Sequence, residues 1–113
     1  MEKKPLFIYI DVDDTLVRKT ESGEEPIPEV VRHVEYLFKN GSILYCWSTG
    51  GEDHARSRAQ RLGIEHCFKG FLHKPQMFID DEEPSNWKNF LHIYPNKLGA
   101  IEDYRKSVKS DGE

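Results

Sequence analysis

The sequence predicts an α/β fold, a three-layer Rossmann-like sandwich with a mainly parallel sheet of about five strands and no cap domain. Three observations favour this class. Short apolar runs alternate along the chain with stretches in which apolar residues recur at helical spacing. The apolar runs are continuous, as expected of strands covered on both faces of a sheet. Polar residues follow three of the runs, at the sheet edge where ligands bind in such folds.

The first run, Leu6 to Ile10, predicts the central strand. It ends abruptly in an acidic turn from Asp11 to Thr15. The following segment from 16 to 26 is polar and carries Ser22-Gly23 at its middle. We therefore expect a loop or a small flexible hairpin there, which we call the flap.

The next elements predict a strand between two helices. Apolar residues at helical spacing indicate a helix from 27 to 38. The run from 43 to 47 predicts a buried strand, which ends in the polar turn from Ser48 to Gly51. A second helix is expected from 52 to 62, with small apolar residues packed and its arginines, Arg56, Arg58 and Arg61, exposed.

Four elements are expected in the remaining sequence. Short apolar runs predict strands at 68–72, 77–79 and 91–94. Apolar residues from 98 to 108 allow a last helix, followed by a flexible tail at 109–113. Successive right-handed crossovers would place helices on both faces of the resulting sheet.

Length and charge limit the function. A chain of 113 residues has the length of a single domain, and its formal net charge is −4. No basic stripe is present, which argues against a nucleic-acid or membrane surface as the main partner. The longest apolar run is too short to span a bilayer, and the N-terminus leads into a strand rather than a signal-peptide core. These features favour a cytoplasmic location.

The cysteines and histidines give little sign of a soft-metal site. Cys46 and Cys67 lack metal-type or redox-type spacing, so we interpret both as small apolar residues, with bound zinc as an alternative. The histidines are scattered without an H-x-x-x-H pair. They are interpreted as surface or hydrogen-bonded residues: His33, His54, His66, His73 and His92.

The acidic turn after the first strand predicts a metal site. Asp11 and Asp13 are separated by Val12, so both carboxylates can face one pocket while Val12 points into the core. Further acids at 80–83 would join them, and close carboxylates raise one another's pKa unless a cation offsets the charge. Mg²⁺ is expected, because the donors are hard oxygens.

An EF-hand calcium loop does not fit this turn. If Asp11 and Asp13 were loop positions one and three, Leu16 would replace the glycine at position six. Ser22 would then replace the glutamate at position twelve. A turn in which Asp and Thr only cap the backbone is the simpler structural interpretation.

The sequence Asp11-Val12-Asp13-Asp14-Thr15-Leu16-Val17 after an apolar strand resembles the first motif of the haloacid dehalogenase-like (HAD) phosphohydrolase superfamily. Ser48 resembles the second motif, Lys74-Pro75 the third, and Asp80-Asp81 the acidic fourth. The matched stretches extend from residue 6 to 83. The first motif is fairly specific, whereas the second and third are weak outside the ordered set.

The resemblance implies a Mg²⁺-dependent phosphatase. Asp11 would be the nucleophile that forms an aspartyl-phosphate, and Asp13 the general acid and base. Lys74 would balance charge. Metal ligation would involve Asp11 and the backbone carbonyl of Asp13, with Asp81 and, less directly, Asp80. Phosphate oxygens would be held by Ser48 and Lys74 with the neighbouring loop residues Asp14, Thr15, Thr49 and Gly50.

Two departures from the family pattern bear on the site. The stretch between Lys74 and Asp80 is too short for the helix that family members often place there. No cap-sized insertion is present either, so the site is expected to be open. The substrate would be a phosphorylated small molecule or macromolecule, and a homo-oligomer could cover the site.

Two other functions remain open at the level of sequence. The chain could be a non-catalytic phosphate- or metal-binding module of the same fold. It could also be a receiver-like signalling domain, which has clustered aspartates, a hydroxyl residue and a lysine. A receiver needs a phospho-accepting aspartate at the end of its third strand, and residues 64 to 73 contain none.

Overall fold

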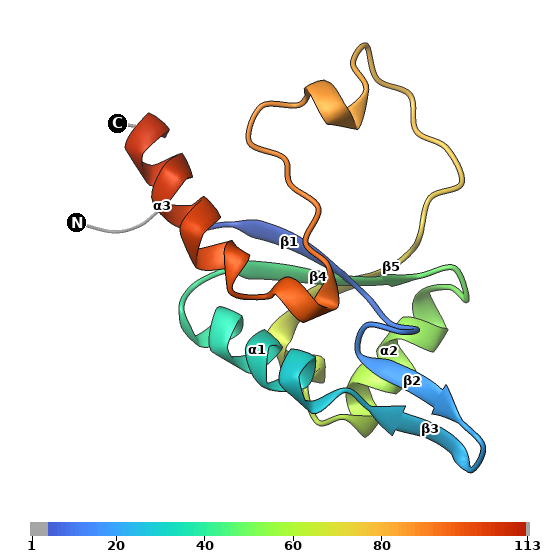
Figure 1. Ribbon diagram of the computed structural model, residues 1–113. Helices are drawn as coiled ribbons and strands as arrows, with labels where there is room; N and C mark the ends of the chain where they lie inside the picture. The colour runs from blue at the N-terminus through green and yellow to red at the C-terminus, as the bar shows by residue number, and fades with distance from the viewer. Residues whose placement is uncertain (1–4, 113) are drawn as a thin grey trace. The chain divides into compact units, whose positions relative to one another are not determined.

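The computed structural model describes the backbone of residues 5–112 and the side chains of residues 5–107. The chain divides into two compact units, Pro5–Lys74 and the part from Pro75 onward, and we describe each by itself (Figure 1). The first unit contains a parallel sheet with helices, which confirms the α/β class. The sequence-predicted site residues at the ends of the first strands all lie in this unit.

Three parallel strands form the sheet, in the order β1-β4-β5. They are β1 (Phe7–Asp11), β4 (Ile43–Ser48) and β5 (Phe68–His73), which confirms the three strands predicted before residue 75. Asp11 lies opposite Trp47 in the register, and Ser48 lies opposite His73. The carboxyl ends of all three strands therefore meet at one edge of the sheet.

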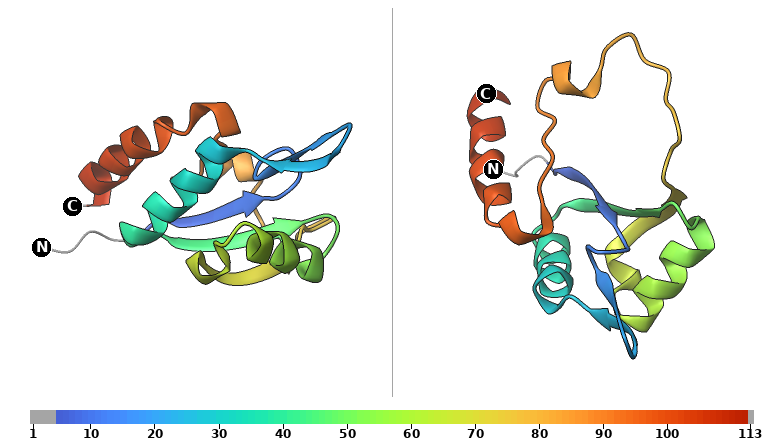
Figure 2. Two further views of the ribbon diagram at one scale, coloured as in Figure 1. Left: turned by 90° about the horizontal axis from the view of Figure 1, so that it is seen from below. Right: turned by 45° about the vertical axis from the view of Figure 1, so that its right-hand side comes forward.

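Helices α1 (Pro28–Lys39) and α2 (Glu52–Arg61) confirm the two predicted crossovers. Both lie on the same face of the sheet (Figure 2). The expectation of helices on both faces is wrong for this unit, because two right-handed crossovers that step in the same direction place both helices on one side. The Rossmann-like three-layer arrangement is therefore not seen within residues 5–74.

The core of this unit lies between the sheet and the two helices. Alternate residues of β4 are buried, and Ser48 is the last of them. The buried apolar side chains include Ile10, Val12, Leu16, Val30, Val34, Leu37, Leu44, Cys46, Ala55 and Ala59. On the other face the Tyr9 ring packs against Tyr45 and Trp47, with ring centroids 5.2 and 4.8 Å away.

The flap is an antiparallel hairpin of β2 (Val17–Thr20) and β3 (Gly23–Pro26). Gly23 has φ of 129°, a backbone conformation that suits glycine at the turn. The hairpin follows the acidic turn directly, and an isolated β-bridge pairs Asp13 of the turn with Val17 of β2. The sequence predicted a loop or a small hairpin, and the hairpin is what forms.

From Pro75 onward the structure describes two short 3₁₀ turns, η2 (Pro84–Asn86) and η3 (Pro95–Lys97), and helix α3 (Ala100–Gly112). The predicted strands at 77–79 and 91–94 are wrong, since neither stretch pairs with another strand among the described residues. The expectation of about five strands in one sheet fails for this reason.

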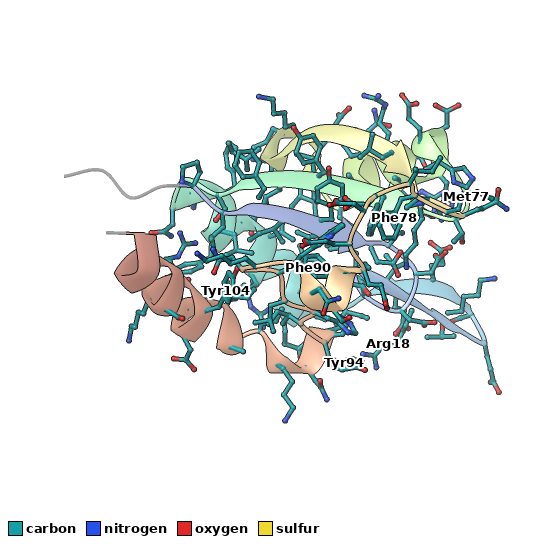
Figure 3. The ribbon with its side chains drawn as sticks, turned by 90° about the horizontal axis from the view of Figure 1, so that it is seen from above. Arg18, Met77, Phe78, Phe90, Tyr94 and Tyr104 are labelled. Atoms are coloured by element: carbon teal, nitrogen blue, oxygen red, sulfur yellow. The ribbon has the colours of Figure 1, made fainter. Side chains whose placement is uncertain are left out.

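Local sequence explains the missing strands. Each run is only three or four residues long, and Pro75, Pro84 and Pro95 flank them. Such short runs need a neighbouring strand to satisfy their backbone groups. Ile79 is 98% exposed, so no apolar partner covers it. The aromatic rings of this segment instead contact one another, with the Trp87 ring centroid 5.6 Å from that of Phe78 and 5.1 Å from that of Phe90. Phe78 and Phe90 are labelled in Figure 3.

The last predicted helix is confirmed, and its backbone continues to Gly112. Residues 109–112, which the sequence assigned to a tail, are helical here. Glu113 lies outside the described residues. No helix within the described part of the chain has the length and apolar character needed to cross a membrane.

Candidate active site

The acidic turn after β1 winds around the buried Val12. The carbonyl oxygen of Val12 accepts hydrogen bonds from the backbone N–H groups of Leu16 at 2.8 Å and Thr15 at 3.2 Å. Asp14 adopts a positive φ of 63°, which Asp tolerates better than most residues. Val12 is buried, as the sequence predicted, and Asp13 and Asp14 are exposed on the outside of the turn.

Asp11, Ser48 and Lys74 come together from three strand ends. The Lys74 Nζ lies 3.7 Å from Asp11 Oδ1. The backbone N–H of Lys74 donates a 2.9 Å hydrogen bond to the carbonyl oxygen of Ser48. Lys74 follows β5 immediately, so this backbone bond holds the lysine beside β4 and within reach of β1. Lys74 is far from Asp11 along the sequence, and the parallel arrangement of the strands brings the two side chains together.

Ser48 is almost fully buried, and its hydroxyl shapes the loop that starts α2. The Ser48 Oγ accepts a 2.9 Å hydrogen bond from the backbone N–H of Gly50. Gly51 closes the turn by donating its N–H to the Ser48 carbonyl oxygen at 3.1 Å, with φ of 104°. The Ser48 hydroxyl hydrogen is then the group that could reach a phosphate oxygen. Thr49 and Gly50 are exposed at the N-terminus of α2, where helix N–H groups favour anions.

His54 is a site residue that the sequence interpretation missed. Its Nε2 lies 3.5 Å from Asp13 Oδ1, and the imidazole packs against Gly50. A Cβ at Gly50 would lie only 3.0 Å from His54 Cγ, so glycine makes room for the ring. The sequence did contain a signal for this residue: His54 lies in the first turn of the helix that was predicted to begin at the edge of the site.

The flap is attached to α2 by an ion pair that the sequence also did not reveal. Arg58 Nε lies 2.9 Å from Glu24 Oε1, and Arg58 Nη2 lies 3.0 Å from Glu24 Oε2. Both side chains are about one-fifth exposed, 19% for Arg58 and 21% for Glu24, so the expectation of an exposed Arg58 is wrong. The hydrogen bond from Arg58 lowers the pKa of the Glu24 carboxyl.

A cavity of about 260 Å³ lies between the acidic turn and the flap. Four residues line it, namely Asp13, Asp14, Val17 and Lys19. Asp13 thus faces His54 as well as this cavity. A group bound beside Asp13 could extend along β2 as far as Lys19.

Asp80 and Asp81 belong to the unit that begins at Pro75, and both are exposed. Asp80 Oδ1 accepts a 2.9 Å hydrogen bond from the backbone N–H of Glu82, which is the geometry of an Asx turn. Within residues 5–107, no group of three or more His, Cys, Asp or Glu side chains lies close enough to hold a metal ion. Mg²⁺ often takes one or two carboxylates together with waters and substrate phosphate, so the oxygen donors of Asp11 and Asp13 fit that ion.

The two cysteines are free and buried, in agreement with their interpretation as small apolar residues. Burial, and to a lesser extent the charge of Asp11, raises the pKa of Cys46 to about 12. Burial also raises the pKa of Cys67. Neither thiol is therefore a thiolate nucleophile at neutral pH.

Comparison of the chain with protein-family models, with curated proteins and with solved structures finds no match.

Proposed function

We propose that this chain is a Mg²⁺-dependent phosphomonoester hydrolase of the HAD type that acts through an aspartyl-phosphate on Asp11. The observation that carries the proposal is the position of Lys74 Nζ, 3.7 Å from Asp11 Oδ1 at the carboxyl edge of the sheet. A carboxylate attacks an anionic phosphoryl group only if nearby positive charge offsets the repulsion. Lys74 supplies that charge from the position just after β5, while leaving the outer side of the turn open.

The reaction would proceed in two displacements. An Asp11 oxygen attacks phosphorus, the ester P–O bond breaks, and the leaving oxygen takes a proton from Asp13. Water then attacks the phosphorus of the aspartyl-phosphate and gives a proton to Asp13. The bond between phosphorus and the Asp11 oxygen breaks, which releases phosphate and regenerates the Asp11 carboxylate. The exposed position of Asp13 suits both steps, because the leaving group and the water must reach it from solvent.

Other predicted residues would bind the phosphoryl oxygens. The hydroxyl hydrogen of Ser48 and the backbone N–H of Thr49 lie just before α2, whereas the Gly50 N–H already donates to Ser48 Oγ and would have to be shared with a phosphoryl oxygen. Thr15 and Asp14 were also expected to contribute, but their backbone N–H groups already donate to the carbonyl oxygens of Val12 and Val17, so Thr15 would contribute through its hydroxyl group. These groups hold the phosphoryl group in line with Asp11, which is the main contribution a protein makes to such a transfer.

The proposed metal site uses oxygen donors. Asp11 and the carbonyl oxygen of Asp13 would hold Mg²⁺, whereas the expected ligands Asp81 and Asp80 belong to the other unit and stay a prediction from the resemblance. When bound, Mg²⁺ would withdraw charge from the phosphoryl oxygens and favour attack by Asp11. We further propose a cytoplasmic enzyme acting on a phosphorylated small molecule or macromolecule, with a second copy of the chain as a possible cover for the open site.

The architecture supports a hydrolase over a receiver-like domain. A receiver would place its phospho-acceptor at the end of its third strand. The third strand of this sheet in chain order, β5, ends at His73 without an aspartate. A non-catalytic module would keep the same anion site but lack turnover, so the experiment below separates it from the enzyme.

The test is phosphate release from a panel of phosphorylated metabolites and 4-nitrophenyl phosphate, with and without Mg²⁺. The wild type should turn over with Mg²⁺, and Asp11→Asn should lose activity by at least about a thousandfold. Asp53→Asn, the same change on the exposed first turn of α2, is the matched control and should retain activity. Turnover retained in Asp11→Asn, or Mg²⁺ binding without any turnover in the wild type, would contradict the proposal.

A further inference from the structure

The flap is built so that one lysine faces the cavity beside the acidic turn. Lys19 on β2 and Asp13 and Asp14 of the turn line the same cavity. The turn and β2 are joined by backbone contacts, since Asp14 donates its N–H to the Val17 carbonyl oxygen at 2.6 Å. Lys19 is two residues beyond Val17 on the same face of the strand, so the backbone fixes its position relative to Asp13.

The residue opposite Lys19 in the hairpin, Glu24, already forms an ion pair with Arg58. Lys19 pairs with Glu24 in the hairpin register, and directly opposite residues share a face. Both carboxylate oxygens of Glu24 accept hydrogen bonds from Arg58. Lys19 itself makes no ion pair with any residue in the part of the chain that the structure describes. Lys19 therefore lines the cavity without an ion-pair partner among the described residues.

The same ion pair holds the hairpin against α2. Arg61 Nη1 adds a longer contact, 3.9 Å from Glu24 Oε1. Strand β2 is therefore held both by its pairing with β3 and by its hydrogen bond to the acidic turn, so the backbone at Lys19 is fixed. The neighbouring Arg18 lies opposite Glu25, on the other face of the hairpin. Arg18 is thus a matched cation of the same strand that does not line the cavity.

We propose that Lys19 is a specificity-determining residue that selects phosphate esters whose leaving group carries a second negative charge. The inference rests on the proposed hydrolase function, in which the leaving oxygen departs beside Asp13. A leaving group that extends from Asp13 into the cavity reaches Lys19. Asp13 and Asp14 would repel an anion there, and Lys19 offsets that repulsion. The cavity, about 260 Å³, suits a small leaving group.

The second negative charge on the leaving group would be either a carboxylate or a second phosphate. Two pairs of test substrates distinguish these alternatives. The first pair is 3-phosphonooxypropanoate and its carboxamide, which differ in charge but hardly in shape. The second pair is propane-1,3-diol bisphosphate and the monophosphate. A charge-assisted hydrogen bond should give the charged member of a pair roughly a tenfold higher kcat/KM in the wild type. The pair with the larger ratio identifies the anion.

Variants then assign the preference to Lys19. Lys19→Met removes the charge and keeps the length of the side chain, so the charged and neutral members should be hydrolysed within about twofold of each other. Lys19→Glu should reverse the preference. Arg18→Met on the opposite face should leave the wild-type ratio unchanged. In Arg18→Met the rate with the carboxamide should also stay near the wild-type value, which shows that the catalytic groups remain intact.

Two outcomes overturn the inference in different ways. Equal kcat/KM for both members of each pair in the wild type, or a preference that survives Lys19→Met, refutes the role of Lys19 and leaves the hydrolase intact. Failure of the wild type to hydrolyse any member with Mg²⁺ refutes the proposed function, and the inference falls with it.

Discussion

Glu24 on β3 and Arg58 on α2 form a two-point ion pair across 34 residues of sequence, with contacts of 2.9 and 3.0 Å. This pair joins the flap to the helix that begins at the candidate phosphate loop. Arg58 belongs to the same helix as His54, which lies against Asp13. One face of α2 therefore positions both the flap and the proposed acid.

We predict that this ion pair contributes stability that is lost in acid. The hydrogen bond from Arg58 lowers the Glu24 pKa below its ordinary value of 4.5. The contribution is therefore present above pH 4.5 and disappears as the pH falls through the lower folded-state value. Urea unfolding should show Glu24→Gln less stable than wild type by about 1 kcal/mol at pH 7, allowing for solvent screening. The difference should shrink towards zero near pH 3.

Arg61 provides the control for this prediction. Its contact with Glu24 is 3.9 Å long and its side chain is 67% exposed. Arg61→Gln should change the free energy of unfolding by less than about 0.5 kcal/mol. A stability difference for Glu24→Gln that stays constant from pH 7 to pH 3 would contradict the interpretation.

Lys74 should be required for turnover rather than for folding. Lys74→Met should lower kcat/KM by about a hundredfold to a thousandfold, because the charge beside Asp11 is lost. The melting temperature should change little, since the side chain is partly exposed. Lys69→Met on the exposed side of β5 is the matched control and should keep its activity. A loss of less than threefold in Lys74→Met would remove Lys74 from the site.

His54 should position Asp13 by donating a hydrogen bond. The present Nε2 to Oδ1 distance of 3.5 Å would shorten to a hydrogen bond when substrate orders the carboxylate. His54→Phe keeps the ring but removes the donor, and kcat should fall by about tenfold with little change in KM. His54→Gln restores an N–H donor and should recover much of the loss. Equal kcat in the two variants would mean that the ring only packs against Gly50.

Gly51 should be intolerant of a side chain because of its backbone conformation. Its φ of 104° and ψ of 175° lie in a region that is essentially restricted to glycine. The nearest atom to an added Cβ, in His73, would be 3.8 Å away, so crowding is not the cause. Gly51→Ala should therefore lower the free energy of unfolding by on the order of 1–3 kcal/mol. Gly99→Ala should lower the free energy of unfolding far less, because an added Cβ at Gly99 meets open space and Gly99 does not have a positive φ in the strained range.

Cys46 should make the protein less stable in alkali. Burial raises its pKa from 9.0 to about 12, so the thiol stays protonated when folded while the unfolded chain loses the proton above pH 9. Stability should then fall by about 1.4 kcal/mol per pH unit above pH 9, relative to Cys46→Ala. Denaturant unfolding of both proteins from pH 8 to pH 10.5 measures the difference. Parallel curves across this range would contradict the prediction.

Local pattern was enough to predict most elements of the first unit. The apolar runs from 6 to 10, 43 to 47 and 68 to 72 form strands, and the helical spacing from 27 to 38 forms α1. Such patterns succeed because each segment buries its own apolar face against the core. The runs at 77–79 and 91–94 carry a similar apolar signal without forming strands, because a strand also needs a partner that its own residues do not specify.

The sequence by itself determined that Asp11 and Ser48 stand at the ends of strands, since strand boundaries and polar turns are encoded in neighbouring residues. It placed Lys74 just before a predicted strand at 77–79, whereas Lys74 directly follows β5. Only the tertiary structure decided that Lys74 contacts Asp11, that His54 contacts Asp13 and that Glu24 holds Arg58. The physical reason is that these contacts depend on strand order and crossover direction. Those properties arise from the packing of the whole unit and have no local signature in the chain.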